Sequence, residues 1–166
     1  YQKLRLLIFL DPLNYDPDLQ NGAWNVIQSL NAESAGGLTA RGWTLGSVSQ
    51  GNYLPVRYTD FIFAVTAEEL GFVGAAVLLL FLGILIWQAL SVAQISRDMF
   101  GRLLAVGVAA LFLCHTLINV GMNMSIMPIT GIPLPFISYG GSFSLTTMAA
   151  VGLLESVALR RHRLTF

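Results

Sequence analysis

The 52 residues from Leu103 to Leu154 include no Asp, Glu, Lys or Arg. A run this long without charge is typical of a chain inside a lipid bilayer, whose hydrocarbon core of about 30 Å takes roughly 20 helical residues to cross. The run is therefore long enough for two passes. Prolines and glycines between Met127 and Gly141 prevent a continuous helix there. The sequence therefore predicts a turn between two membrane-spanning helices.

A third apolar segment precedes these two, and its only charged residues between Phe61 and Ser96 are Glu68 and Glu69. Hydrophobic residues make up 55% of the chain and charged residues 11%, which excludes a disordered chain and disfavours a soluble globular domain. The single cysteine, Cys114, excludes an intrachain disulfide. We therefore expect an all-α integral membrane protein, a polytopic helix bundle with a large extracytoplasmic loop. The expected spans are about 61–95, 102–127 and 142–159, with a Pro/Gly-rich connection at 128–141.

The basic residues indicate how these helices are oriented. Arg97 and Arg102 lie in the short connection between the first two spans, and three further arginines follow the last span. Short loops rich in Lys and Arg stay on the cytoplasmic side, whereas long loops are largely exempt from this rule. The sequence therefore predicts a cytoplasmic carboxy-terminal tail, and it places residues 1–60 and the connection at 128–141 on the extracytoplasmic face.

Residues 1–60 alternate apolar clusters with turn-forming residues, which is typical of a folded loop that is either functional or a plain surface lid. We expect an interfacial helix at residues 1–10. The other elements expected are a short helix at residues 16–22, a helical turn or two at residues 23–30, and tight turns at 34–37 and 41–43.

Three acidic residues lie near or within the first span. Asp60 falls where the polar loop meets the span, so it could either serve chemistry at the lipid-water rim or simply cap the helix. In a straight helix, Glu68 and Glu69 would lie roughly 12 to 14 Å deeper than Asp60, at a depth where carboxylates usually face a cavity or a partner. Gly71, further along the same helix, is expected to permit close helix packing.

The second span carries a polar stripe, because His115, Asn119 and Asn123 recur at intervals of four residues. We predict that Glu68 or Glu69 forms a hydrogen bond with Asn119 or His115. The alternative is ordinary interhelical hydrogen bonding that holds the bundle together.

Several sequence blocks occur in an order that resembles one known family. They are YQKLRLLIFLDP at the start, IQSL at 27–30, AGG at 35–37, YLPVRYTDFIFAVTAEELG at 53–71 and PITGIPLPFISYGGS at 128–142. Together they resemble the shape, elongation, division and sporulation (SEDS) family over essentially the whole chain, and TGIPLPF resembles its elongation branch more than its division branch. The resemblance implies the SEDS fold. This chain would then be the carboxy-terminal portion of a ten-span protein of the bacterial inner membrane, with its last three spans.

Members of that family polymerise peptidoglycan strands from lipid II, a disaccharide-pentapeptide carried on undecaprenyl pyrophosphate. The resemblance therefore implies an inverting glycosyltransferase that forms β-1,4 bonds. It also implies that Asp60, in the TDF motif, is the essential acidic residue. A sugar hydroxyl is a poor nucleophile, and a carboxylate within hydrogen-bond reach can take its proton as it attacks. Implied partners are the growing glycan strand, a class B penicillin-binding protein and membrane lipids, with no nucleic acid.

The departing pyrophosphate develops negative charge, which a cation close to the membrane surface would stabilise. The basic residues on the predicted extracytoplasmic side are Lys3, Arg5, Arg41 and Arg57. Arg57 and Arg5 are the preferred candidates, and the alternative for Arg57 is a pair with Asp60 or with lipid headgroups. The sequence shows no metal-ligand cluster, so a divalent cation such as Mg²⁺ or Mn²⁺ would be held jointly with the phosphates.

Three positions depart from the family pattern. Val56 and Tyr58 stand where Glu and His are common around the arginine, and Phe143 follows GGS where a second small residue is usual. Two functions of other classes also stay open, a noncatalytic scaffold and a transporter of lipid-linked precursors. A transporter needs its decisive carboxylate near the membrane midplane, as Glu68 or Glu69 would be, whereas a polymerase needs it at the lipid-water rim.

Overall fold

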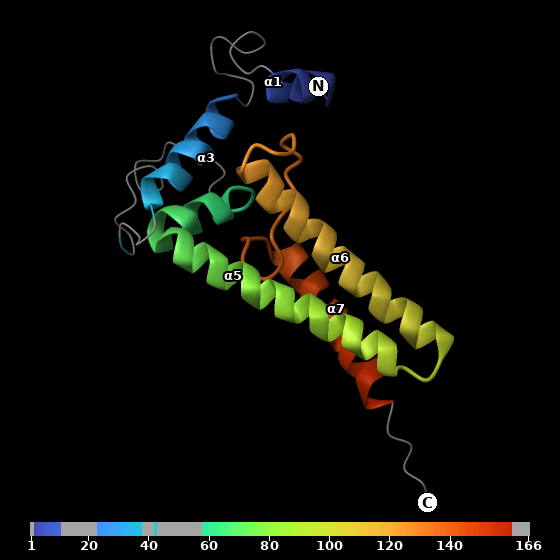
Figure 1. The fold of residues 1–166 in the computed structure, drawn as a ribbon. Helices are drawn as coiled ribbons and strands as arrows, with labels where there is room; N and C mark the ends of the chain where they lie inside the picture. The colour runs from blue at the N-terminus through green and yellow to red at the C-terminus, as the bar shows by residue number, and fades with distance from the viewer. Residues whose placement is uncertain (1, 11–22, 38–41, 43–57, 161–166) are drawn as a thin grey trace, which may run out of the picture.

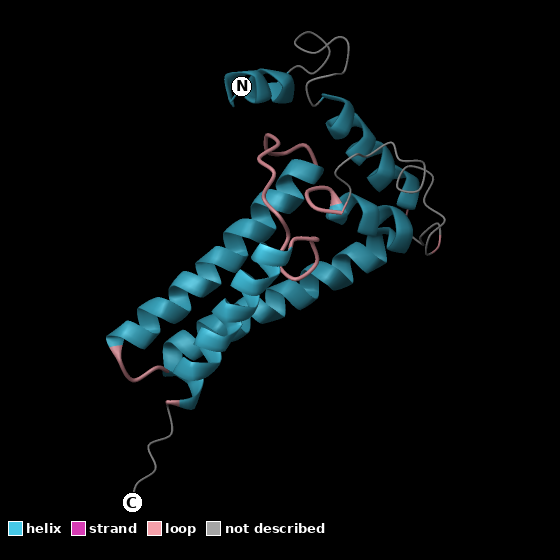
Figure 2. Cartoon of the chain, turned by 180° about the vertical axis from the view of Figure 1, so that it is seen from behind, coloured by secondary structure: helices cyan, strands magenta, loops and turns pink. Residues whose placement is uncertain are grey.

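The computed structural model describes residues 2–10, 23–37, 42 and 58–160, and within these ranges every regular element is a helix (Figure 2). The helices are α1 (Gln2–Leu10), α3 (Ala23–Gly36), α5 (Ile62–Ile95), α6 (Met99–Asn123) and α7 (Gly141–Leu159). The last three are long and apolar enough to span a membrane. The all-α fold class with three long apolar helices is thereby confirmed. The helix predicted at residues 16–22 lies outside the described residues.

The three long helices form one bundle, in which α5 and α6 lie side by side and α7 packs against both (Figure 1). Its core is rich in alanine, which lets helices approach closely. Large apolar side chains such as Trp87 and Leu103 are exposed, as expected of surfaces that face lipid or neighbouring helices. The buried core residues are Ala89, Ala93, Ala105, Val108, Ala109, Phe112, Ala150 and Leu154.

Helix α6 ends at Asn123, four residues before the predicted end. The N–H groups of Ile126 and Met127 fold back onto the carbonyl of Gly121 at 2.8 and 3.0 Å, and Ser125 takes a left-handed conformation with a φ of 54°. Such partners satisfy carbonyls that the helix itself leaves without donors. The connection to α7 therefore covers residues 124–140.

Helix α5 is broken at Gly71, whose φ of 67° and ψ of −173° lie in a region open essentially to glycine alone. The break frees the N–H of Phe72, which donates to the carbonyl of Gly37 at 3.0 Å. Figure 1 shows that the part of α5 before Gly71 runs across the end of the bundle instead of along it. Residues 72–95 alone are long enough to span a membrane.

This break adds to one expectation and corrects another. Gly71 is buried, and it also bends the chain, which the expectation of close helix packing did not include. The depth expected for Glu68 and Glu69 assumed that α5 runs along the bundle from Asp60 onward, and it is wrong because the segment before Gly71 runs across the end of the bundle (Figure 1). Both glutamates belong to this short segment, which directly follows the turn at Asp60.

Helix α3 packs on the first part of α5, and Gly36 makes their contact possible. A Cβ atom at Gly36 would overlap the main-chain carbonyl of Ala67. The helix runs well past Leu30, so the turn expected to begin at Ser34 begins only at Gly37, which has a φ of 58°. The glycine that suggested an earlier turn, Gly36, instead lies inside the helix at its contact with α5.

We expect Gly36→Ala to lower the free energy of unfolding by roughly 1–3 kcal/mol, the usual cost of overpacking a close contact. The matched control is Gly107→Ala in α6, because a Cβ at Gly107 meets nothing within 4 Å. Thermal unfolding in detergent measures both variants. Equal midpoints for the two would contradict the contact between α3 and α5.

Candidate functional site

The turn that precedes α5, residues 58–60, is held by its main-chain carbonyls. The carbonyl of Tyr58 accepts a hydrogen bond from the N–H of Tyr139 at 2.8 Å. The carbonyl of Thr59 accepts one from the hydroxyl of Ser138. Because both donors belong to the connection between α6 and α7, the turn and the connection hold each other in place.

The third carbonyl of the turn, that of Asp60, accepts hydrogen bonds from two buried asparagines of α6. Nδ2 of Asn119 lies 3.0 Å from this oxygen and 2.8 Å from the carbonyl oxygen of Ile132, so one amide joins the turn to the connection. Nδ2 of Asn123 lies 3.2 Å from the Asp60 oxygen. The hydroxyl of Ser29 in α3 donates to the main-chain carbonyl of Asn123 at 3.1 Å. We call the turn at 58–60, the connection at 124–140 and the two asparagines the Asp60 unit.

The carboxylate of Asp60 lies at the edge of the Asp60 unit. A Cβ built on Gly131 would be 3.3 Å from its Oδ2 atom. Asp60 is half-buried and Gly131 is exposed, and Gly131 takes a left-handed φ of 72° that glycine adopts without strain. Helix α5 has Phe61 as its N-cap, with no side-chain cap. Asp60 therefore does not cap the helix, and its carboxylate stands beside a residue without a side chain.

Two residues of the polar stripe of α6, His115 and Asn119, contact the connection. Nδ1 of His115 lies 3.2 Å from the carbonyl oxygen of Pro133. The imidazole also stacks on Phe143, with ring centroids 5.1 Å apart and planes 17° apart. Phe143, which departs from the family pattern, therefore packs against the stripe.

The predicted hydrogen bond between a glutamate and the polar stripe is wrong. Within the described residues, the amide N–H groups of Asn119 meet main-chain carbonyls, and His115 meets Pro133. Glu68 is fully buried, and its Cα lies 3.0 Å from a Cβ built on Gly36. The bend in α5 explains the difference, because it brings this stretch of α5 against α3.

Two of the four predicted basic residues are described. The Nη1 atom of Arg5 donates to the carbonyl of Ile129 at 3.2 Å, so α1 reaches the connection two residues before Gly131. Lys3 is exposed on α1. Arg41 and Arg57 lie outside the described residues. The structure therefore brings Arg5 to the Asp60 unit and leaves the phosphate-binding role of all four as a prediction.

The Asp60 unit holds no metal site of its own. In the part of the chain that the structure describes, no group of three or more His, Cys, Asp or Glu could hold a metal ion. Asp60 alone is a weak donor set for Mg²⁺ or Mn²⁺, which are usually bound through one or two carboxylates together with substrate phosphates. The residues present therefore fit a cation only if a substrate supplies the other ligands.

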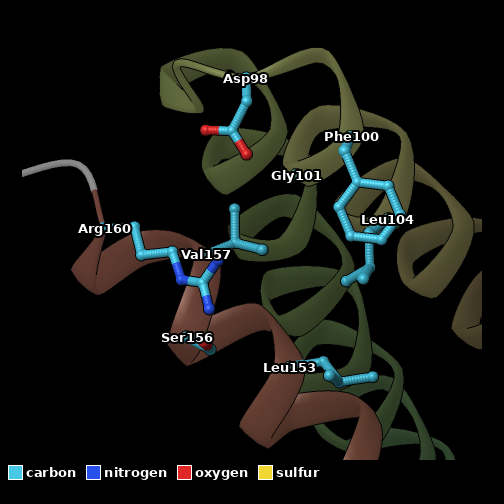
Figure 3. A pocket seen from close by; sticks show the side chains of 8 residues that line it. All are labelled: Asp98, Phe100, Gly101, Leu104, Leu153, Ser156, Val157 and Arg160. Carbon is cyan, nitrogen blue, oxygen red and sulfur yellow. The ribbon is translucent and has the colours of Figure 1, made fainter.

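A small cleft lies at the other end of the bundle, between the start of α6 and the end of α7 (Figure 3). Asp98 and Arg160 line it together with apolar side chains, and its volume is about 100 Å³. Pockets for small organic ligands usually measure roughly 300–1,000 Å³. The cleft is therefore too small for a lipid-linked sugar.

Glu33 of α3 has a perturbed carboxyl group that the sequence did not reveal. Its Oε1 atom is buried and makes no hydrogen bond within the described ranges. Burial raises the pKa of this carboxyl from 4.5 to about 7. Folding therefore favours the neutral form of Glu33.

We expect the stability of the protein to fall as pH rises from about 4.5 to about 7, because the folded state keeps a proton on Glu33 that the unfolded state releases. Partial exposure reduces the effect to on the order of 1–2 kcal/mol. Thermal midpoints at pH 5 and pH 8 measure it, and Glu33→Gln should lose most of this difference. A difference that Glu33→Gln keeps in full would show that another group causes it.

Comparison with known sequences shows the family. The model of the FtsW/RodA/SpoVE cell cycle proteins matches residues 1–163. The peptidoglycan glycosyltransferase MrdB of Escherichia coli K12 is 41% identical, over 99% of this chain and 44% of that protein. RodA of Treponema pallidum is 44% identical, over 97% of this chain and 36% of that protein. The probable peptidoglycan glycosyltransferase FtsW of Synechocystis is 42% identical, over 95% of this chain and 39% of that protein. The chain thus spans about two fifths of the length of these relatives.

Solved structures agree with this result. A chain from a peptidoglycan synthase complex that coordinates polymerization and crosslinking has a TM-score of 0.74 and 31% identity, over 98% of this chain and 43% of that chain. A mutant of the Thermus thermophilus rod shape determining protein RodA has a TM-score of 0.61 and 30% identity, over 97% of this chain and 57% of that chain. The chain therefore belongs to the FtsW/RodA/SpoVE family of multi-pass membrane proteins.

Proposed function

We propose that this chain forms part of a peptidoglycan polymerase of cell elongation, which joins lipid II-derived disaccharides into β-1,4 glycan strands. The placement of Asp60 carries the proposal: two buried amides fix its main chain, and its carboxylate stays half-exposed beside Gly131. Relatives named peptidoglycan glycosyltransferases support the activity. Other segments of the full-length protein would complete the substrate groove.

In the proposed reaction, Asp60 is the general base. The 4-hydroxyl of one glycan attacks the anomeric carbon of the other, and the hydroxyl proton passes to the Asp60 carboxylate. The bond from the anomeric carbon to the pyrophosphate oxygen breaks, and undecaprenyl pyrophosphate leaves with the electron pair. Attack opposite an α-linked pyrophosphate gives a β-1,4 bond with inversion.

The leaving pyrophosphate needs positive charge near Asp60. Arg5 is the described candidate, because it contacts the connection beside Gly131, and Lys3, Arg41 and Arg57 complete the set. A divalent cation bound to the phosphates would supply further charge stabilisation.

A transporter of lipid-linked precursors is the second candidate, and the bend at Gly71 counts against it. A transporter needs a decisive carboxylate near the membrane midplane. Glu68 and Glu69 precede the bend and lie in the part of α5 that crosses the end of the bundle. Helix α6 contains no acidic residue at all.

The proposed setting is the bacterial inner membrane, with the Asp60 unit on the extracytoplasmic side and the tail in the cytoplasm. The charge pattern supports this orientation, because Arg97 and Arg102 lie at the opposite end of the bundle from Asp60. The proposed partner is a class B penicillin-binding protein, whose transpeptidase would crosslink the strands. Elongation branch and division branch relatives are about equally similar, 44% for RodA and 42% for FtsW, so TGIPLPF alone favours elongation.

Two assays on the purified full-length protein separate polymerase from transporter. Labelled lipid II is incubated with the protein and run on a gel for glycan polymer, and the same preparation in vesicles is tested for movement of lipid II between leaflets. The proposal predicts a polymer ladder. Leaflet exchange without any polymer would favour the transporter.

A further inference from the structure

We infer that Asn119, assisted by Asn123, is a positioning residue that sets where the Asp60 carboxylate meets the acceptor hydroxyl. The inference rests on the proposed function. It concerns the hydrogen bonds of α6 to two main-chain carbonyls, and it assigns no contact between the asparagines and the substrate.

Asn119 fixes both sides of the space around the Asp60 carboxylate. Its amide donates to the carbonyl of Asp60 on one side and to the carbonyl of Ile132 on the other. Ile132 directly follows Gly131, whose main chain lies beside the carboxylate. One side chain therefore joins residue 60 directly to the segment of the connection that faces its carboxylate.

Asn123 supports this arrangement from the next turn of α6. Its amide donates to the main-chain carbonyl of Asp60 at 3.2 Å and to the main-chain carbonyl of Asn119 at 2.8 Å. It also lies 3.3 Å from Oδ1 of Asn119, which orients the Asn119 amide so that its N–H groups face the two carbonyls. Both side chains are fully buried, so solvent cannot replace these bonds.

Few other side chains could do this. An amide has two N–H donors in one plane, whereas a hydroxyl has one donor and an ionised carboxylate has none. Apolar residues would fill the space, but they would leave the Ile132 carbonyl without the Asn119 donor and the Asp60 carbonyl with Asn123 alone. Loss of the Asn119 amide therefore removes the bridge between Asp60 and Ile132, while the bonds of Tyr58 and Thr59 to the connection remain. Asp60 can then shift within the turn, and a displacement of about 1 Å at a reacting group can cost about 100-fold in rate.

The test measures kcat and KM for labelled lipid II with the full-length protein in complex with its penicillin-binding partner. Asn119→Ala is expected to lower kcat by roughly 30- to 100-fold and to change KM by less than about threefold, because the base is misplaced while the binding groups remain. Asn123→Ala is expected to lower kcat by roughly 3- to 10-fold. Thr116→Val is the matched control on the same helix, because buried Thr116 bonds only to the carbonyl of Phe112 in its own helix.

The outcomes separate this inference from the proposed function. Wild-type kcat in Asn119→Ala, or equal losses in Asn119→Ala and Thr116→Val, would overturn the positioning role. A rise in KM with kcat unchanged would overturn it too. If Asn119→Ala does not fold, Asn123→Ala decides, and an unchanged kcat there overturns the inference. Wild-type activity in Asp60→Ala would instead remove the proposed base itself.

Discussion

Replacing Asp60 with asparagine is expected to lower kcat for glycan polymerisation by about 10²- to 10⁴-fold, the range that a positioned general base contributes. Asparagine has nearly the same size, and the main-chain bonds of residue 60 to α6 do not depend on its side chain. Asparagine cannot take a proton, so the loss should fall on kcat with little change in KM. Initial rates with labelled lipid II measure both.

The matched control for this substitution is Asp98→Asn. Asp98 is an exposed aspartate at the opposite end of the bundle, just before α6. The Asp98→Asn substitution should leave kcat for polymerisation unchanged. A rate for Asp60→Asn within about threefold of the wild type would show that Asp60 is not the base.

The second large effect is expected from Gly71→Ala. Alanine cannot adopt the backbone conformation of Gly71 without a cost of about 1–3 kcal/mol. The chain can avoid this cost by continuing α5 as a straight helix, which would pull residues 58–70 away from α3 and the connection. Activity should therefore fall by at least about tenfold, since even about 1 Å of misplacement is expensive, and the thermal midpoint should fall with it.

Gly83→Ala is the matched control in the same helix. A Cβ at Gly83 meets nothing within 4 Å, and alanine favours a helix by roughly 0.5–1 kcal/mol over glycine. Gly83→Ala should therefore keep full activity and unfold at the same or a higher temperature. Equal activity of the two variants would contradict a functional role of the bend.

The spans could be predicted because hydrocarbon imposes a simple rule on the sequence. Long runs without charge gave three helices, and proline and glycine marked the connection between α6 and α7. The bend at Gly71 could not be predicted, because a glycine that breaks a helix and a glycine that packs against a neighbour have the same sequence signature. The wrong depth for Glu68 and Glu69 followed from that one residue.

The site was only partly predictable for a related reason. The spacing of His115, Asn119 and Asn123 correctly indicated one polar face of α6, but their acceptors are main-chain carbonyls, which every residue has. Because main-chain carbonyls leave no mark in a sequence, the pattern favoured the glutamates as partners. Without the family resemblance, two roles stayed open for Asp60, a helix cap and a reactive acid. Only the resemblance of the TDF motif to the family favoured the acid. Its catalytic role stays a prediction.

The proposed reaction requires Asp60 to stand at the extracytoplasmic end of the bundle, open to substrate. Cysteine labelling tests this directly, with Asp60→Cys in a Cys114→Ser background and Arg97→Cys as the cytoplasmic control, in spheroplasts treated with a membrane-impermeant maleimide. We expect Asp60→Cys to be labelled from outside, and Arg97→Cys to be labelled only after the membrane is opened. Labelling of Asp60→Cys only after the membrane is opened would contradict an extracytoplasmic Asp60.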